Sequence, residues 1–189
     1  MLKSRYKIRR KLSNLSFIGS VITLLIVPIT YSSATSVNSI FFVTKSDNGN
    51  QVHYGVQVNP DCSLKSSQPV YPYWKLESGR LEGLLAIEVP IFGIANQSVS
   101  GNEVVMEINA LRGREISKPI TIRSTETGSQ GCQILAFTQI NGEVTGLSQV
   151  HIDWTRDGFF GLGGTVHSIA FYGTDKSQEK IVCRANCRF

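Results

Sequence analysis

Three histidines and one aspartate are the side chains best suited to acid–base chemistry in this chain of 189 residues. His53 and His151 occupy polar positions of two segments in which apolar and polar residues alternate, and Asp153 follows His151 by two residues. If these faces converge in one barrel, the side chains form an acid–base pair of the kind used by hydrolases. The three histidines, which include His167, lack the i, i+2 or i, i+4 spacing of a metal pair, so we predict no metal site and no cofactor. Surface or hydrogen-bonded histidines explain the pattern better.

Aromatic residues with polar atoms gather in two segments that we expect to be neighbouring strands. They are Tyr54, Tyr71, Tyr73 and Trp74. Such rings suit the mouth of a ligand-binding barrel, because one end is apolar and the other forms hydrogen bonds. They also suit ordinary cross-strand packing, which is the favoured interpretation. If the domain has a pocket, Tyr54, Tyr73 and Trp74 are the residues that we expect to line it.

Residues 158–164 are rich in glycine and contain two phenylalanines and a leucine. A phosphate-binding loop normally opens a helix, whereas residues 165–172 have the pattern of a strand, so we predict no phosphate site. The apolar side chains either contact a lipid, a partner or an apolar ligand, or fold back over the end of the domain, and we favour the second. The sequence also lacks a Gly-x-Ser-x-Gly elbow and a thiol-enzyme signature, so a non-enzymatic role is favoured.

Four cysteines provide an even count, as expected for disulfides in an exported chain. They are Cys62, Cys132, Cys183 and Cys187. Sequence alone leaves three connectivities open. A bridge between Cys183 and Cys187 constrains little chain, whereas pairing either with Cys62 or Cys132 closes a long loop and ties down the C-terminal tail. Zinc binding is disfavoured because the cysteines are spread singly, without paired CxxC spacing.

The net charge of +5 comes from the N-terminus. Six of the 19 basic residues lie in residues 1–11, and residues 1–34 contain no acidic residue, so the remainder carries 13 basic and 14 acidic residues. Nucleic-acid binding needs basic residues clustered on the folded surface, so we exclude nucleic acid as a partner.

Residues 1–34 have the three parts of a signal peptide: a basic start, an apolar stretch at 15–31 and the small residues Ser32 and Ala34 at a cleavage site. The alternative is a retained membrane anchor, because about 17 apolar residues lie at the short end for a span. Both interpretations place residues 35–189 outside the cytoplasm, in the periplasm or secreted. Membrane contact is then expected through the leader alone.

Residues 35–189 have the pattern of a single mainly β domain. Short apolar runs alternate with turn signals such as Asp47-Asn48-Gly49-Asn50 and Asn141-Gly142. One short helix is predicted from about Arg80 to just before Pro90. Sequential hairpins indicate an antiparallel meander that forms a small barrel or a sandwich. The predicted strands are 40–43, 51–58, 70–77, 103–108, 120–122, 132–140, 150–154, 166–172 and 181–184.

Three short motifs carry a family resemblance: Asn-Gln-Val-His-Tyr at 50–54, Pro-Val-Tyr-Pro-Tyr-Trp at 69–74 and Phe-Tyr-Gly at 171–173. In order and spacing they resemble the bacterial domain-of-unknown-function family 4833, over roughly residues 40–175. The charged helix expected after the Tyr-Trp strand is short here. The resemblance implies no activity and transfers no catalytic residue.

These observations favour an exported, non-enzymatic binding or interaction module of the cell envelope. Its partner is an apolar small molecule, an envelope component or another protein. Two alternatives stay open: an envelope hydrolase that uses His151 with Asp153 or His53, and a structural module stabilised by disulfides.

Overall fold

The computed structural model describes residues 39–112, 117–128, 131–155 and 164–184. The predicted signal peptide or anchor in residues 1–34, Cys187 and nearly all of the glycine-rich segment 158–164 lie outside the described residues. The described residues all belong to one compact unit, Thr35–Phe189. The fold is therefore that of the segment predicted to form the β domain.

Among the described residues the chain forms eleven strands, one short α-helix and one turn of 3-10 helix. In chain order they are β1 (Phe41–Lys45), β2 (Asn48–Val56), β3 (Val70–Lys75), β4 (Leu81–Gly83), α1 (Val89–Phe92), β5 (Ile94–Ser100), β6 (Glu103–Ile108), η1 (Asn109–Leu111), β7 (Ile120–Glu126), β8 (Cys132–Ile140), β9 (Glu143–Thr155), β10 (Thr165–Gly173) and β11 (Gln178–Val182). The predicted mainly β class with one short helix is confirmed.

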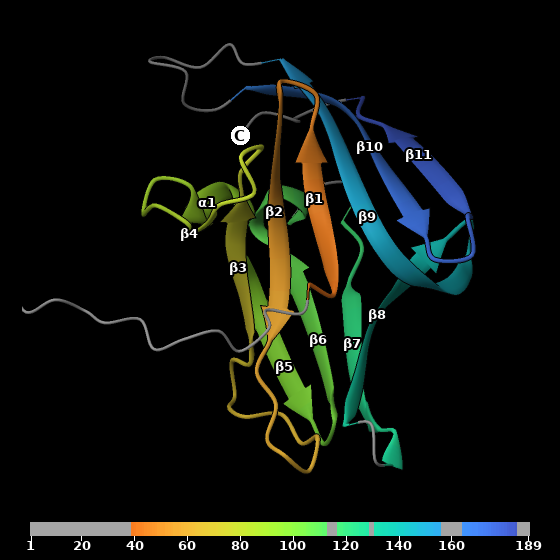
Figure 1. Ribbon diagram of the computed structural model, residues 1–189. Helices are drawn as coiled ribbons and strands as arrows, with labels where there is room; N and C mark the ends of the chain where they lie inside the picture. Colours follow the sequence, from red (N-terminus) through yellow and green to blue (C-terminus); the bar gives the residue numbers. More distant parts are fainter. Residues whose placement is uncertain (1–38, 113–116, 129–130, 156–163, 185–189) are drawn as a thin grey trace, which may run out of the picture. The chain divides into compact units, whose positions relative to one another are not determined.

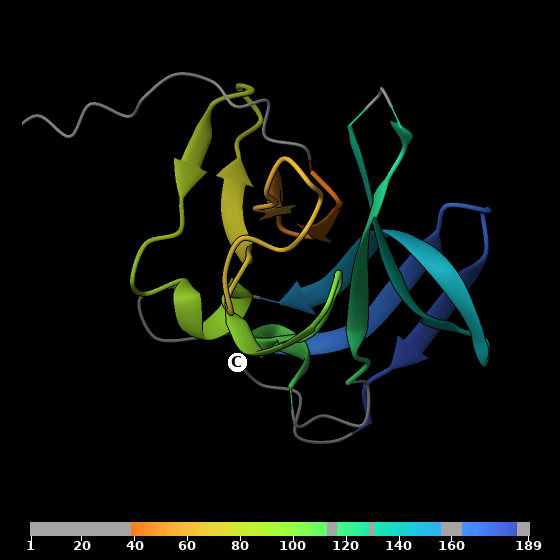
Figure 2. The same cartoon turned by 90° about the horizontal axis from the view of Figure 1, so that it is seen from below.

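The strands form two sheets that share β9. The first sheet has the order β4-β3-β2-β1-β9-β10-β11, and the second has the order β5-β6-β7-β8-β9. The start of β9, at residues 143–146, pairs with β8, and residues 147–155 pair with β10. Figures 1 and 2 show β9 curving away from β8 to run beside β10, which in turn pairs with β11. A strand of 13 residues is long enough to serve both sheets in turn.

The core lies between the two sheets, because alternate residues of each strand point inward. Its largest fully buried side chains come from both sheets and include Phe41, Tyr54, Met106, Ile120, Ile122, Ile152 and Phe171. The sheet path is open, with β4 and β5 at its two ends. Of the two predicted architectures, the sandwich therefore fits and the closed barrel does not.

A side chain connects the sheets where backbone pairing stops. The Gln97 side chain of β5 donates from Nε2 to the Val70 carbonyl at 3.0 Å and accepts from the Val70 amide at 3.1 Å through Oε1. Pro72 lies in the part of β3 that β4 leaves unpaired, since β4 pairs with residues 73–75 alone. Proline is tolerated at such an edge position, and Gln97 satisfies backbone groups that an open edge leaves exposed.

The topology departs from a simple meander at one pair of strands. β1 runs parallel to β9, with Val43 opposite Val150 and Lys45 opposite Ile152. Because β9 diverges from β8, one edge of β9 is left without β8 as its neighbour. This edge pairs with β1, a strand of the first hairpin, and not with a strand that is adjacent in sequence. A parallel pair between distant segments leaves no turn signal in the sequence.

The predicted helix from Arg80 to Pro90 is wrong in position. Residues Leu81–Gly83 form β4, and α1 begins at Val89 with Pro90 in its first turn. Proline fits there because the first amides of a helix have no intrahelical acceptor. The spacing of Leu81, Leu84 and Leu85 suggested a helix, but Leu81 and Leu85 are exposed. β5 was not predicted.

The two predicted hairpins are confirmed, with one shift. Asn141 and Gly142 both have positive φ, at 54° and 87°, as a two-residue hairpin turn requires. The first hairpin turns at residues 46–47, so Asn48 to Asn50 begin β2 instead of forming the turn. Along residues 132–140 one face of β8 is buried, and Leu135 on the other face is exposed although it is apolar.

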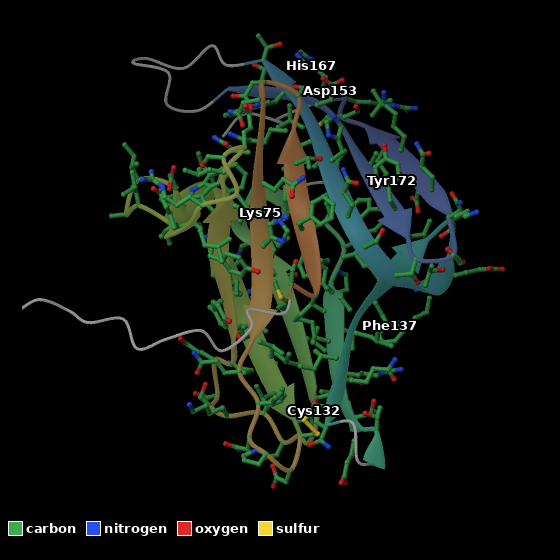
Figure 3. All side chains as sticks on the ribbon, viewed as in Figure 1. Lys75, Cys132, Phe137, Asp153, His167 and Tyr172 are labelled. Carbon is green, nitrogen blue, oxygen red and sulfur yellow. A yellow bond between two sulfur atoms is a disulfide. The ribbon has the colours of Figure 1, made fainter. Side chains whose placement is uncertain are left out.

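A disulfide joins Cys62 to Cys132. Cys62 lies in the loop between β2 and β3 of the first sheet, and Cys132 begins β8 of the second sheet. The bond therefore links the two sheets at the end of the domain opposite His167 (Figure 3). Of the three connectivities left open by the sequence, this bond excludes the two that pair Cys62 and Cys132 with the C-terminal cysteines. Cys183 is also disulfide-bonded.

Candidate functional site

The three aromatic candidates lie on neighbouring strands, as predicted, but point in two directions. β2 and β3 pair antiparallel, with Val52 opposite Trp74 and His53 opposite Tyr73. Alternation along each strand directs Tyr54 and Trp74 toward the core side and Tyr73 toward the outer face. The structure therefore does not bring the three rings together in one pocket.

Tyr54 is a core residue. Its ring stacks on Phe41 with 4.6 Å between centroids, and its hydroxyl donates to the Phe92 carbonyl at 2.8 Å. The side chain is fully buried, and this burial raises the pKa of the phenol. Tyr54 therefore holds the end of α1 and lines no pocket. Its prediction as a ligand residue has no support from its position.

Tyr73 belongs to a row of stacked rings on the outer face of the first sheet. Centroid distances are 6.0 Å from Tyr71 to Tyr73, 5.6 Å from Tyr73 to His53 and 5.2 Å from His53 to Phe42. Burial raises the pKa of both tyrosines. Tyr73 and His53 are themselves buried, so the row shows the ordinary cross-strand packing that the favoured interpretation predicted.

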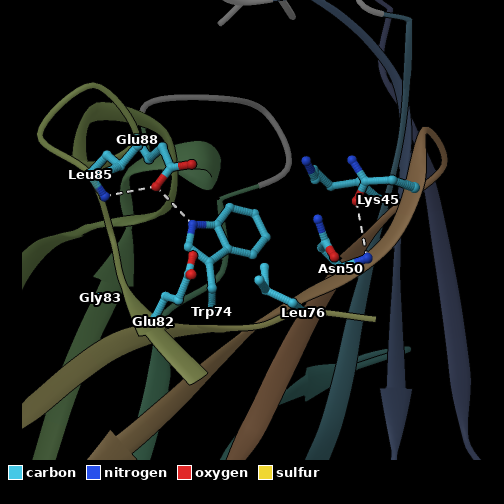
Figure 4. Close-up of a pocket in the computed structure, with 9 residues that line it drawn as sticks. Lys45, Asn50, Trp74, Leu76, Glu82, Gly83, Leu85 and Glu88 are labelled. Carbon is cyan, nitrogen blue, oxygen red and sulfur yellow. Dashed lines mark hydrogen bonds between the residues drawn. The ribbon is translucent and has the colours of Figure 1, made fainter. Parts of the chain in front are cut away.

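Trp74 is the aromatic candidate that lines a pocket. The pocket has a volume of about 220 Å³ and lies between β1–β2, β3 and the segment from β4 to α1. Figure 4 shows the Trp74 indole between Glu88 on one side and Lys45 and Asn50 on the other. The lining residues are Lys45, Asn48, Asn50, Trp74, Leu76, Glu82, Gly83, Leu85 and Glu88.

Glu88 fixes one wall of this pocket. Its Oε2 accepts hydrogen bonds from Trp74 Nε1 and from the Leu85 amide, both at 2.8 Å. The two bonds lock the carboxylate against the indole and hold the turn before α1 in place. Among the described residues, Glu88 Oε1 has no hydrogen-bond partner. A carboxylate held in this way presents a fixed acceptor to a ligand.

Lys45 stands on the opposite side, packed among aromatic rings. Its Nζ lies 5.1 Å from the Trp74 ring centroid and 5.4 Å from those of Phe92 and Trp154. Asp47 Oδ1 is 3.5 Å away, and the lysine side chain is 7% exposed. A partly desolvated ammonium over several ring faces is a cation–π arrangement, so Lys45 holds the aromatic wall together as well as lining the pocket.

Two asparagines complete the wall on the Lys45 side. Asn48 Oδ1 accepts from the Asn50 amide at 3.1 Å, and Asn50 Oδ1 accepts from the Glu77 amide at 3.0 Å. With their oxygens engaged, the side-chain NH2 groups are the parts of these residues left to donate to a ligand. The pocket thus offers amide donors on one wall, a carboxylate acceptor on the other, and a tryptophan between them.

Sequence reasoning missed the polar residues of this pocket. For Lys45 a signal existed, since Phe41, Val43 and Lys45 alternate and must share the inward face of one strand. No sequence signal identified Glu88 and Asn50 as pocket residues, because their place in the pocket depends on how the segment from β4 to α1 folds back over β3.

The predicted acid–base residues lie on the outer face of the first sheet, but they are engaged separately. His151 Nδ1 is hydrogen-bonded to Thr44 Oγ1 at 2.9 Å, and Asp153 Oδ2 accepts from Ser168 Oγ at 3.4 Å. His167 Nε2 contacts Thr155 Oγ1 at 2.7 Å. In the described part of the chain no hydrogen bond joins a histidine to Asp153, so the arrangement gives no support to a general acid–base pair.

His53 is hydrogen-bonded through both of its ring nitrogens. Its Nε2 lies 2.8 Å from Gln51 Oε1, and its Nδ1 lies 2.6 Å from Ser39 Oγ, both within hydrogen-bond distance. Burial, followed by the positive charge of Lys75, lowers the pKa of His53 below its ordinary value of 6.5. This packing makes His53 a structural residue of the aromatic row.

Stability should therefore fall as the pH drops below about 6.5. The unfolded chain takes up a proton at the ordinary pKa, whereas the folded chain resists it, so protonation favours unfolding. We expect urea unfolding at pH values below about 6.5 to show this loss, and His53→Gln, which keeps hydrogen-bonding capacity, to reduce it. A wild-type curve that is flat over this range, or a loss that His53→Gln leaves unchanged, contradicts the assignment.

No group of three or more His, Cys, Asp or Glu residues in the described ranges is arranged to hold a metal ion. No helix in the same ranges is long and apolar enough to cross a membrane.

The fold and the pocket define a class of protein: a disulfide-linked β-sandwich domain with a small polar pocket beside an edge strand. A family model described as "Domain of unknown function (DUF4833)" matches residues 41–184. The chain therefore belongs to the DUF4833 family, and the resemblance seen in its sequence motifs is confirmed. No curated protein and no solved structure matches the chain.

Proposed function

We propose that this domain is a non-enzymatic binding module that holds a small hydroxyl-bearing molecule in the Trp74 pocket. One observation carries the proposal: the indole lies between the fixed carboxylate of Glu88 and the amide groups of Asn48 and Asn50. A few convergent polar groups around an aromatic surface are the usual composition of a small-molecule site.

The chemistry of the walls selects the ligand class. A carboxylate accepts hydrogen bonds from hydroxyls, side-chain amides donate to hydroxyl or carbonyl oxygens, and an indole packs against the apolar face of a ring. A volume of about 220 Å³ is below the range of drug-sized pockets and suits one ring with its substituents. A sugar unit of the pyranose type meets these conditions.

The location that we propose is outside the cytoplasm, in the cell envelope or secreted. The Cys62–Cys132 bond supports this, because disulfides persist in oxidising compartments. The basic and apolar residues at 1–34 support it independently, as a signal peptide or an anchor. Envelope glycans are then accessible ligands.

The test is titration of the protein with methyl glucoside, N-acetylglucosamine and glucuronate, followed by tryptophan fluorescence and calorimetry. We expect saturable binding of at least one sugar, and a loss of about tenfold or more in Glu88→Gln, since a charged hydrogen-bond acceptor contributes about 1.5–3 kcal/mol. The glutamine side chain of this variant still has an oxygen that accepts from the Trp74 indole. We therefore expect the substitution to affect ligand binding more than the fold.

Glu103→Gln is the matched control, because Glu103 pairs with Arg123 on a different sheet and is not among the residues that line the Trp74 pocket. We expect its sugar affinity to equal that of the wild type. The proposal is wrong if none of the three sugars binds the wild-type protein, or if Glu88→Gln binds as well as the control variant.

A second candidate is a structural module stabilised by disulfides, favoured by the Cys62–Cys132 link between the sheets. This candidate predicts that the Trp74 pocket binds none of the sugars. It also predicts that the stability of the domain depends strongly on the disulfide.

A further inference from the structure

Exposed aliphatic side chains gather in the turn at the mouth of the Trp74 pocket. Leu85, Ile87 and Val89 are 65%, 52% and 44% exposed. The amides of Glu88 and Val89 both donate to the Leu85 carbonyl, at 2.8 and 3.2 Å, so the three residues occupy one tight helical turn. We call Leu85, Ile87 and Val89 the aliphatic turn. Leu85 also lines the pocket.

The concentration of these side chains needs an explanation. Single exposed apolar residues are common on protein surfaces. Here, however, half of the eight large apolar residues exposed in the described ranges fall within nine positions, Leu81 to Val89. An exposed apolar cluster beside a polar cavity indicates that a partner covers it when bound.

The aliphatic turn is also held in a fixed place relative to the pocket. Glu88 lies within the turn, and its carboxylate binds both the Trp74 indole and the Leu85 amide. α1 follows directly, and Asn109 Nδ2 donates to the Val89 carbonyl at 2.9 Å. A molecule seated against Trp74 and Glu88 therefore meets the aliphatic turn as it leaves the pocket.

We infer that the ligand is an amphiphile, with a polar head in the Trp74 pocket and a hydrocarbon chain along the aliphatic turn. This inference rests on the proposed function and names the ligand class of the same site. A single amphiphile fits better than an anionic membrane surface, because Glu82 precedes the turn, Glu88 lies within it, and Arg80 is paired with Glu82. Carboxylates beside the contact disfavour an anionic lipid surface.

The experiment compares methyl, butyl, hexyl and octyl glucoside below their micelle concentrations. We expect affinity to increase about two- to fourfold for each methylene that reaches the turn, because each one buries apolar surface. Ile87→Ser/Val89→Ser should remove most of this dependence on chain length, and neither residue lines the pocket. Leu135→Ser, at an exposed position of β8, is the matched control and should keep it.

The outcomes separate the inference from the function on which it rests. If methyl glucoside binds but longer chains add no affinity, the amphiphile is excluded and the sugar pocket stands. If no glucoside of any length binds while another of the three sugars does, the amphiphile inference is wrong and the sugar pocket stands. If none of the sugars and no glucoside binds, both proposals are wrong. If the gain from the chain survives in Ile87→Ser/Val89→Ser, the chain lies elsewhere and the inference is wrong.

A membrane arm completes the test. Vesicles of phosphatidylcholine, with and without phosphatidylglycerol, are sedimented with each variant. Should the wild type bind vesicles through Ile87 and Val89 while single glucosides show no gain from the chain, the turn is a membrane contact and the inference is overturned. Chain-dependent binding of glucosides without vesicle binding supports it.

Discussion

Replacing both Cys62 and Cys132 by serine is expected to lower the free energy of unfolding by about 4 kcal/mol. The bond closes a loop between residues separated by 70 positions, and loop-closure entropy for that length gives a value of this order. The bond also ties the loop after β2, in the first sheet, to the start of β8, in the second. Its loss therefore acts on the contact between sheets and not on one hairpin.

Urea unfolding of the wild type and the Cys62→Ser/Cys132→Ser protein measures this loss. Cys183→Ser/Cys187→Ser is the control, because it removes the other two cysteines and leaves the link between the sheets intact. We expect this control to lose much less stability than the first variant. If the Cys62→Ser/Cys132→Ser protein unfolds within about 1 kcal/mol of the wild type, the bond does not stabilise the sandwich.

The strands with one buried face were predictable because their pattern is local. In β2, Val52, Tyr54 and Val56 alternate with polar or small residues, and in β9, Val150 and Ile152 do the same. Each strand needs its own side chains to divide between core and solvent, so its sequence alone carries the signal. The turn at Asn141 and Gly142 is equally local, since positive φ restricts the residue type.

The order of the strands in the sheets was harder to predict from the sequence, because it depends on which strand edge remains free to pair. β9 leaves β8 after residue 146, and β1 then fills the open edge as a parallel neighbour from the other end of the chain. The sequence of β1 contains no residue that specifies this partner. Leucine spacing in residues 81–85 was similarly ambiguous, since β4 pairs with β3 by backbone hydrogen bonds that the side chains do not encode.

The candidate site was likewise predictable only in part. Trp74 was predicted as a pocket residue and lies on its wall, whereas Tyr54 and Tyr73, chosen by the same reasoning, pack in the core and in the outer aromatic row. One strand carries both Tyr73 and Trp74, so adjacent positions must face opposite sides. Residue type indicated which side chains suit a ligand, and only the packing of the segment from β4 to α1 decides which of them meets a cavity.

That packing depends on Tyr54, which makes its substitution the most informative change in the core. The Tyr54 hydroxyl donates to the carbonyl of Phe92, the last residue of α1, and the Phe92 ring lies edge-on to Trp74 at 5.4 Å. Tyr54→Ala should lower the free energy of unfolding by about 3–5 kcal/mol, as for other large aromatic residues removed from a core.

Tyr54→Phe separates the hydroxyl from the ring. It keeps the stack on Phe41 and leaves the Phe92 carbonyl without its donor, which we expect to cost about 1–2 kcal/mol. Urea unfolding measures both losses, and Tyr172→Ala, at a half-buried position on β10, is the control with a much smaller expected effect. Because Glu88 lies directly before α1 and lines the pocket, Tyr54→Phe should also weaken sugar binding more than its modest loss of stability suggests. Equal stability of Tyr54→Phe and the wild type, with unchanged Trp74 fluorescence, means that the hydroxyl neither holds α1 nor positions the pocket.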